Sequence, residues 1–379
     1  MHFRFFLSDQ HGDIELSAED LQQPFLISPT ETHPFLTLAD YFGALQKFIT
    51  QNTGRALSAV LHQENPTDDI DEIVIRSEKH GAFYHIASVS LVGIGEKNRF
   101  AVTSAISETA RSSLEEEMQV LQQLADKSAD FIPEIYCHET VRWGNDSGAE
   151  EFLMVLGKWL DDYHEWHASE VPETTGECKI QLWDYENGYR FLSEKESHEL
   201  LRQAAYILTY YYDQASYRQI YPWHHGAGDF IAKCEPGAIS VKLITARQYE
   251  PLVDFDQYED ADNLVAAIHF LLNLVLRMRL DRLDGVSEPV WLETYAVRAA
   301  IAGFFAGLAA SKENDRLLVG PVEDFLAIMQ SFEVREILDM YASLLEIYAE
   351  EDQDDFNLIR EKIENHSKEL WQELQNFSL

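Results

Sequence analysis

Strand-forming and helix-forming segments are separated along the chain, and this separation limits the possible fold classes. Residues 72–106 contain three runs rich in β-branched and aromatic residues, interrupted by glycines. A helical pattern follows at 112–128 and a buried strand at 151–160, and nearly everything from residue 260 onward is helical. Residues 288–310 are apolar on most faces, which is typical of a central buried helix. We therefore predict an α+β fold with a small sheet-rich part and a large helical part.

The changes in composition predict three segments. The acidic, turn-rich stretch NPTDDID (65–71) separates an N-terminal extension, residues 1–65, from a small β-rich lobe over 66–157. Residues 158–379 form a helical lobe, in which strand signals reappear at 229–255. We expect these strands to be an inserted pair.

The charge of the chain excludes several kinds of partner. The 29 basic and 66 acidic residues give a net charge of −37, which repels nucleic acids and anionic membranes. The three cysteines are widely spaced without a CxxC motif, which favours a reducing compartment. The apolar start is too short for a signal peptide, and no run approaches the ~20 residues of a membrane helix. We expect a cytoplasmic protein that binds neither nucleic acid nor membrane.

The stretch YPWHHGAGDFIAK (221–233) is the strongest candidate for chemistry. It places His224 and His225 before a Gly-Ala-Gly turn, with Asp229 just ahead of an apolar run. Three interpretations fit: a metal site, a phosphate-binding loop, or the altered catalytic loop of a phosphotransferase. The segment DDYHEWH (161–167) could supply further histidines to a His/Asp metal centre, although it lacks the HExxH spacing of zinc peptidases.

The order of the segments resembles that of the protein kinase-like superfamily, in particular aminoglycoside and choline phosphotransferases, over roughly residues 70–280. IVIRSEKHGAFYHIASV resembles the first two strands with their phosphate-covering loop, and FAVTSAI resembles the third strand. LEEEMQVLQQL resembles the helix whose glutamate pairs with a third-strand lysine, and EFLMVLGKWL resembles the hinge that contacts adenine. The resemblance implies a nucleotide site that includes Gly81, Thr103, Glu117 and Leu156.

The same resemblance implies roles for the loop residues. Phosphoryl transfer needs a cation on the phosphates, a bound metal and a carboxylate that orients the incoming hydroxyl. With DFI aligned on the family's NIL, Asp229 takes the metal-binding position and His224 takes that of the catalytic aspartate. Asp254 in VDFD matches the second metal-binding aspartate, whereas Thr103 stands where the lysine is expected. His224 or His225 could accept a proton but could not supply the usual negative charge.

These replacements favour an atypical or degenerate, pseudokinase-like protein. It would bind a nucleotide or phosphorylated ligand with a divalent metal in the interlobe cleft, with ATP and Mg²⁺ as the implied cofactors. The alternative is an active small-molecule phosphotransferase that uses His224 or His225 in place of aspartate, with Lys97, Arg99 or Arg247 as the missing cation. A third hypothesis is a scaffold whose acidic surface recruits a basic protein partner.

Overall fold

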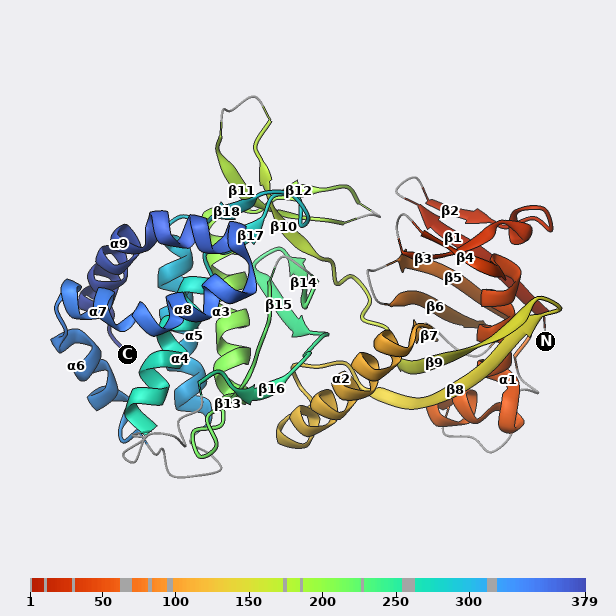
Figure 1. Cartoon of the computed structure of the whole chain (residues 1–379), viewed down its shortest axis with the longest axis horizontal. Coiled ribbons are helices and arrows are strands. Elements are labelled where there is room, and N and C mark those ends of the chain that lie inside the picture. The colour runs from red at the N-terminus through yellow and green to blue at the C-terminus, as the bar shows by residue number, and fades with distance from the viewer. Residues whose placement is uncertain are drawn as a thin grey trace. The chain divides into compact units, whose positions relative to one another are not determined.

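The chain folds into two compact units, Met1–Asp161 and Asp162–Leu379. The computed structural model describes residues 2–9, 12–28, 31–61, 70–80, 84–93, 98–172, 176–184, 187–225, 228–253, 263–311 and 319–379. Figure 1 shows a β-rich first unit, coloured red to yellow, and a mostly helical second unit, coloured green to blue. The predicted mixed class is confirmed, and the division lies close to the expected end of the β-rich lobe at residue 157. No helix within the described ranges is long and apolar enough to cross a membrane.

The first unit is built on a seven-stranded sheet with the order β2-β1-β5-β6-β7-β9-β8. Its strands are β1 (His2–Asp9), β2 (Gly12–Glu15), β5 (Glu72–His80), β6 (His85–Val92), β7 (Arg99–Ala105), β8 (Ile135–Asn145) and β9 (Gly148–Lys158). All neighbours are antiparallel except β1 and β5, which are parallel. The five strands from β5 to β9, with a helix after the third, keep the order that the sequence predicts.

The first 65 residues belong to this unit. They add β1 and β2 to the sheet, and they contain the hairpin β3 (Pro24–Ser28) and β4 (Glu31–Thr37), the short helix η1 (Asp20–Gln22) and the long helix α1 (Leu38–Leu61). Phe42 and Phe48 of α1 pack in one buried cluster with Ile73 and Val102 of the sheet. The segment expected to be an extension therefore supplies much of the core of the first unit.

The other face of the sheet packs against α2 (Glu108–Lys127). The side chain of Ser107 caps this helix by accepting a hydrogen bond from the amide of Ala110. The apolar residues that the sequence placed on one stripe are buried there, namely Leu114, Met118, Leu121 and Leu124. This confirms the amphipathic helix predicted at 112–128.

Two helices form the centre of the second unit, α3 (Glu194–Tyr211) and α5 (Tyr295–Ala310). Gly303 allows their close approach, since a Cβ atom there would lie 2.3 Å from the carbonyl oxygen of Arg202. The predicted central helix at 288–310 is present, but it begins at residue 295 because residues 289–291 form a short strand. The surrounding helices are α4 (Asn263–Arg277), α6 (Val322–Ser331), α7 (Val334–Met340), α8 (Ala342–Glu351) and α9 (Gln353–Asn376).

Short strand pairs of the second unit position the candidate site. They comprise β10 (Trp166–Glu170) with β11 (Cys178–Leu182) and β12 (Arg190–Phe191), β13 (Arg218–Ile220) with β16 (Tyr249–Pro251), β14 (Phe230–Glu235) with β15 (Ala238–Leu243), and β17 (Leu280–Arg282) with β18 (Pro289–Trp291). The strand signals predicted at 229–255 correspond to β14, β15 and β16. The pairing of β13 with β16 brings together the two ends of the segment that connects them. This connecting segment contains His224, Asp229 and Arg247.

Candidate functional site

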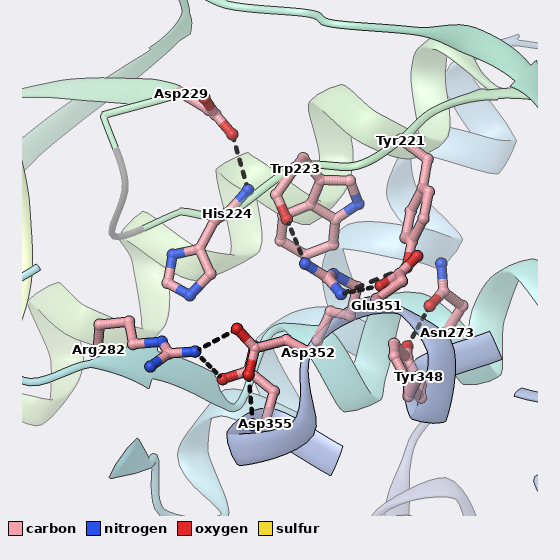
Figure 2. A network of polar contacts seen from close by, with 11 residues as sticks. Tyr221, Trp223, His224, Asp229, Asn273, Arg282, Tyr348, Glu351, Asp352 and Asp355 are labelled. Carbon is pink, nitrogen blue, oxygen red and sulfur yellow. Dashed lines mark hydrogen bonds and ion pairs between the residues drawn. The ribbon is translucent and has the colours of Figure 1, made fainter. Parts of the chain in front are cut away.

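Residues 221–225 and Asp229, together called the histidine loop below, include side chains that contact the end of α4 and α8. The guanidinium of Arg277 donates a hydrogen bond of 3.0 Å to the carbonyl oxygen of Trp223 and lies over the ring of Tyr221. The hydroxyl of Tyr221 donates to the carboxylate of Glu351 at 2.5 Å and 2.6 Å. Figure 2 shows Tyr221 and Trp223 of the loop beside Glu351 of α8, which lies far from them in the sequence. The loop is therefore fixed by tertiary contacts.

The carboxylate of Asp229 is buried and already paired. Both of its oxygens lie 2.7 Å from guanidinium nitrogens of Arg247, and Oδ2 also accepts the amide of His224 at 2.8 Å. Asp229 is 1% exposed, whereas the side chain of Arg247 is 45% exposed and closes the pair on the solvent side. Burial raises the pKa of Asp229, and Arg247 opposes this effect.

A magnesium ion does not fit this arrangement. Mg²⁺ needs open carboxylate or carbonyl oxygens, and here the guanidinium of Arg247 faces both oxygens of Asp229. The second predicted ligand, Asp254, lies outside the described residues. Among the residues that are described, no group of three or more His, Cys, Asp or Glu side chains could hold a metal ion.

The two adjacent histidines lie beside a buried aspartate that the sequence reading missed. Nδ1 of His224 and Nδ1 of His225 each lie 3.9 Å from a carboxylate oxygen of Asp281. Asp281 is wholly buried and accepts the amides of Ala168 at 2.8 Å and Arg282 at 2.7 Å. The side chain of His224 is 16% exposed and that of His225 is 0% exposed.

These histidines should make the second unit sensitive to acid. Burial is the main cause that lowers the pKa of His224 well below its usual range and that lowers the pKa of His225, with Arg277 and Arg282 adding repulsion at His224. The unfolded chain takes up these protons below about pH 6.5 and the folded chain does not, so stability falls as pH drops below that value. Each such histidine contributes up to about 1.4 kcal/mol per pH unit.

The measurement is the free energy of unfolding at pH 7.5 and pH 5.5, in the native chain and in His224→Asn. We expect the variant to lose less stability on acidification, because it lacks one group that titrates only after unfolding. An equal loss in the two proteins would contradict a neutral, buried His224. His138→Asn, at an exposed position on β8 of the first unit, is the control, because an exposed histidine takes up its proton in the folded chain as well.

The residues predicted to bind a nucleotide do not all lie on the same face of the sheet in the first unit. Thr103 is half-buried on β7, opposite Val155 of β9, and on the face that packs against α2. Leu156 lies on the opposite face, in the core cluster with α1. Glu117 is buried on α2, and Gly81 lies outside the described residues.

The remaining sequence candidates have local partners. Arg99 forms an ion pair with Glu78 at 2.5 Å and stacks over Trp159 at 4.0 Å, whereas Lys97 lies outside the described residues. In the segment 161–167, His164 lies 3.6 Å from a carboxylate oxygen of Asp184. His167 is buried, with its ring 4.3 Å from that of Trp183, and its charge would repel protonated His225. His167 therefore lies near the histidine loop. The described residues around it do not form a group of three or more side chains that could hold a metal ion.

The residues that hold the loop have a recognisable sequence signal. Arg277 and Asp281 occur in LRMRLDRL, which spans the end of a strongly apolar helix and the residues after it. Charged residues at such a position are rarely buried unless they are paired. Alternating charges that continue a buried segment therefore indicate an internal polar network, although the sequence cannot name the partners.

Comparisons with known proteins give weak structural likeness and no sequence match. No family model matches the chain, and no curated protein matches it. Among solved structures, a choline kinase from Cryptosporidium parvum Iowa II has a TM-score of 0.34 and 10% identity, covering 80% of this chain and 90% of that chain. A Plasmodium kinase domain has a TM-score of 0.30 and 12% identity, covering 80% of this chain and 85% of that chain. These values do not assign an activity to the chain.

Proposed function

We propose that this protein is a degenerate, pseudokinase-like binding module that does not transfer phosphoryl groups. The observation that carries the proposal is the ion pair between Asp229 and Arg247, in which both carboxylate oxygens face a guanidinium at 2.7 Å. A phosphotransferase needs the metal-binding carboxylate to be open, and here an internal cation takes the place of the metal.

The order of the elements supports the kinase-like part of this proposal. In the first unit, β5, β6 and β7 are followed by α2 and then by β8 and β9. In the second unit, a long helix precedes β13, the histidine loop, the hairpin β14–β15 and the returning strand β16. This is the order that the sequence resemblance implies for a helix, a catalytic loop and the segment that contains Asp254.

The ligand that we propose is a nucleotide or another phosphorylated molecule, bound without a metal at Asp229. The side chain of Arg247 is 45% exposed, so its guanidinium could also contact a phosphate oxygen. Thr103, at the lysine position, can offer only a neutral hydroxyl. The exposed guanidinium of Arg247 and the neutral hydroxyl of Thr103 both favour binding of a phosphorylated ligand over transfer of its phosphoryl group.

An active small-molecule phosphotransferase remains the second candidate, and one observation favours it. His224 is partly exposed, and burial lowers its pKa so that the imidazole stays neutral and able to accept a proton. His225 is fully buried and could act only through His224. In this alternative, His224 would take a proton from the substrate hydroxyl.

A pair of measurements separates the two candidates. We expect ATP, at concentrations well above its dissociation constant, to raise the melting temperature equally in Mg²⁺ and in EDTA, with no ATP turnover above the blank. A ligand present at 100 times its dissociation constant stabilises a protein by about 2.7 kcal/mol. Metal-dependent turnover that is lost in both Asp229→Asn and His224→Ala would establish the phosphotransferase instead. If neither ATP, ADP nor other phosphorylated metabolites stabilise the protein, the ligand class is wrong.

A further inference from the structure

A cavity of about 340 Å³ lies in the first unit, at the beginning of α2. The hairpin β3–β4 forms one side of it, and the start of α2 and the first part of β9 form the other. Its volume is at the lower end of the range for small-molecule sites, roughly 300–1,000 Å³. Ile27, His33 and Pro34 come from the first 65 residues, outside the part of the chain that resembles kinases. The cavity is therefore a feature that the proposed function does not explain.

His33 directs a hydrogen-bond donor into this cavity. Its Nδ1 accepts the amide of Leu36 at 3.1 Å, so the neutral ring carries its proton on Nε2. Nε2 lies 3.6 Å from Oε1 of Glu150, which is beyond the usual hydrogen-bond distance. His33 is 8% exposed and lines the cavity, and its Nε2 has no acceptor within hydrogen-bond distance among the described residues. A ligand oxygen at this point would satisfy it.

The charges at the cavity favour a cation. Glu108 and Glu150 contribute two carboxylates, against the single guanidinium of Arg111. Arg111 is already engaged, since it donates to the carbonyl oxygens of Ile106 and Glu151. The chain as a whole is also strongly acidic. An anion would therefore meet net repulsion here, whereas a positively charged nitrogen would find two carboxylates.

We propose that this cavity binds a small organic cation that carries a hydroxyl or carbonyl oxygen near its charged nitrogen. The nitrogen would lie between the carboxylates of Glu108 and Glu150, and the oxygen would accept the Nε2 proton of His33. The carbon skeleton would pack on the apolar wall formed by Ile27, Pro34 and Ile106. The buried ring of His85 also lines the cavity, and it packs at a tilt 4.4 Å from the ring of Phe25 and 5.5 Å from that of Tyr41.

The test is calorimetric titration of the full chain with three matched probes. 1,3-Diamino-2-propanol carries both features, 1,3-diaminopropane lacks the oxygen, and glycerol lacks the charge. We expect saturable binding in the order amino alcohol, diamine, glycerol. Glu150→Gln should weaken the binding of both amines by about tenfold, the usual size of a lost charged hydrogen bond. His33→Asn keeps an acceptor for the amide of Leu36 but removes the Nε2 donor, so it should weaken only the amino alcohol.

Glu116→Gln is the matched control, because Glu116 is exposed on the same helix and does not line the cavity. Equal effects of Glu116→Gln and Glu150→Gln would show general attraction to an acidic surface, and would overturn the proposal. So would the absence of saturable binding of the amino alcohol at millimolar concentration to a chain whose melting curve is intact. Tighter binding of glycerol than of either amine would show that charge does not determine the ligand.

Discussion

Replacing Arg277 by leucine should lower the free energy of unfolding of the second unit by about 2–3 kcal/mol. Arg277 is 8% exposed, and its guanidinium lies beside the buried backbone carbonyl of Trp223 and phenol of Tyr221. It also lies beside the carboxylate of Glu351, whose side chain is 33% exposed. Leucine fills part of the volume but leaves the carbonyl oxygen of Trp223 without its charged donor and Glu351 without its cation. The loss of this buried hydrogen bond should cost more than the loss of an exposed ion pair.

The measurement is chemical denaturation of the native chain and the variant, with the slope on denaturant concentration checked to be unchanged. Arg298→Leu is the control, because the side chain of Arg298 is 49% exposed and its nearer partner, Glu194, is 70% exposed. We expect Arg298→Leu to cost less than about 1 kcal/mol. A similar small effect for Arg277→Leu would show that the histidine loop does not depend on this anchor. The double variant Arg277→Leu/Glu351→Leu should regain part of the loss, since it also removes the carboxylate that has lost its cation.

The order of the elements could be read from the sequence because each depends on local patterns. Leu114, Met118, Leu121 and Leu124 repeat at helical spacing, and all four are buried in α2. Strand runs between glycines likewise predicted β5, β6 and β7. The parallel pairing of β1 with β5 could not be read in the same way, because its partners lie 70 residues apart and nothing local specifies the register.

The candidate site was predicted only in part, for a similar reason. Asp229 was predicted to be a metal ligand, and in the structure its buried carboxylate forms an ion pair with Arg247. Eighteen positions separate the two residues, and their meeting depends on the hairpin β14–β15 between them. Asp281 was missed because it follows α4, far along the chain from His224 and His225. A sequence pattern identifies residue types suited to chemistry, while tertiary pairing decides whether they remain available for it.

Replacing Arg247 by methionine tests that pairing directly. The variant leaves the carboxylate of Asp229 buried at 1% exposure without a counter-charge, and we expect a loss of about 3 kcal/mol in the free energy of unfolding. Asp229→Asn in the same background should restore most of the loss, because a neutral amide needs no cation. Arg190→Met is the matched control: Arg190 is 42% exposed, close to the 45% of Arg247, but its partner Glu196 is 33% exposed. Its replacement should cost less than about 1 kcal/mol.

The same variants determine whether the guanidinium has replaced a metal. If Arg247 holds Asp229 as the structure indicates, Mg²⁺ at millimolar concentration should leave the melting temperature of the native chain unchanged. Stabilisation of the native chain by Mg²⁺ that disappears in Asp229→Asn would contradict this, since it would require the metal to displace Arg247. Equal stability of Arg247→Met and Arg190→Met would show that the buried carboxylate does not depend on its guanidinium. In that case the main argument against phosphoryl transfer would fail, and His224 would have to be tested as a base.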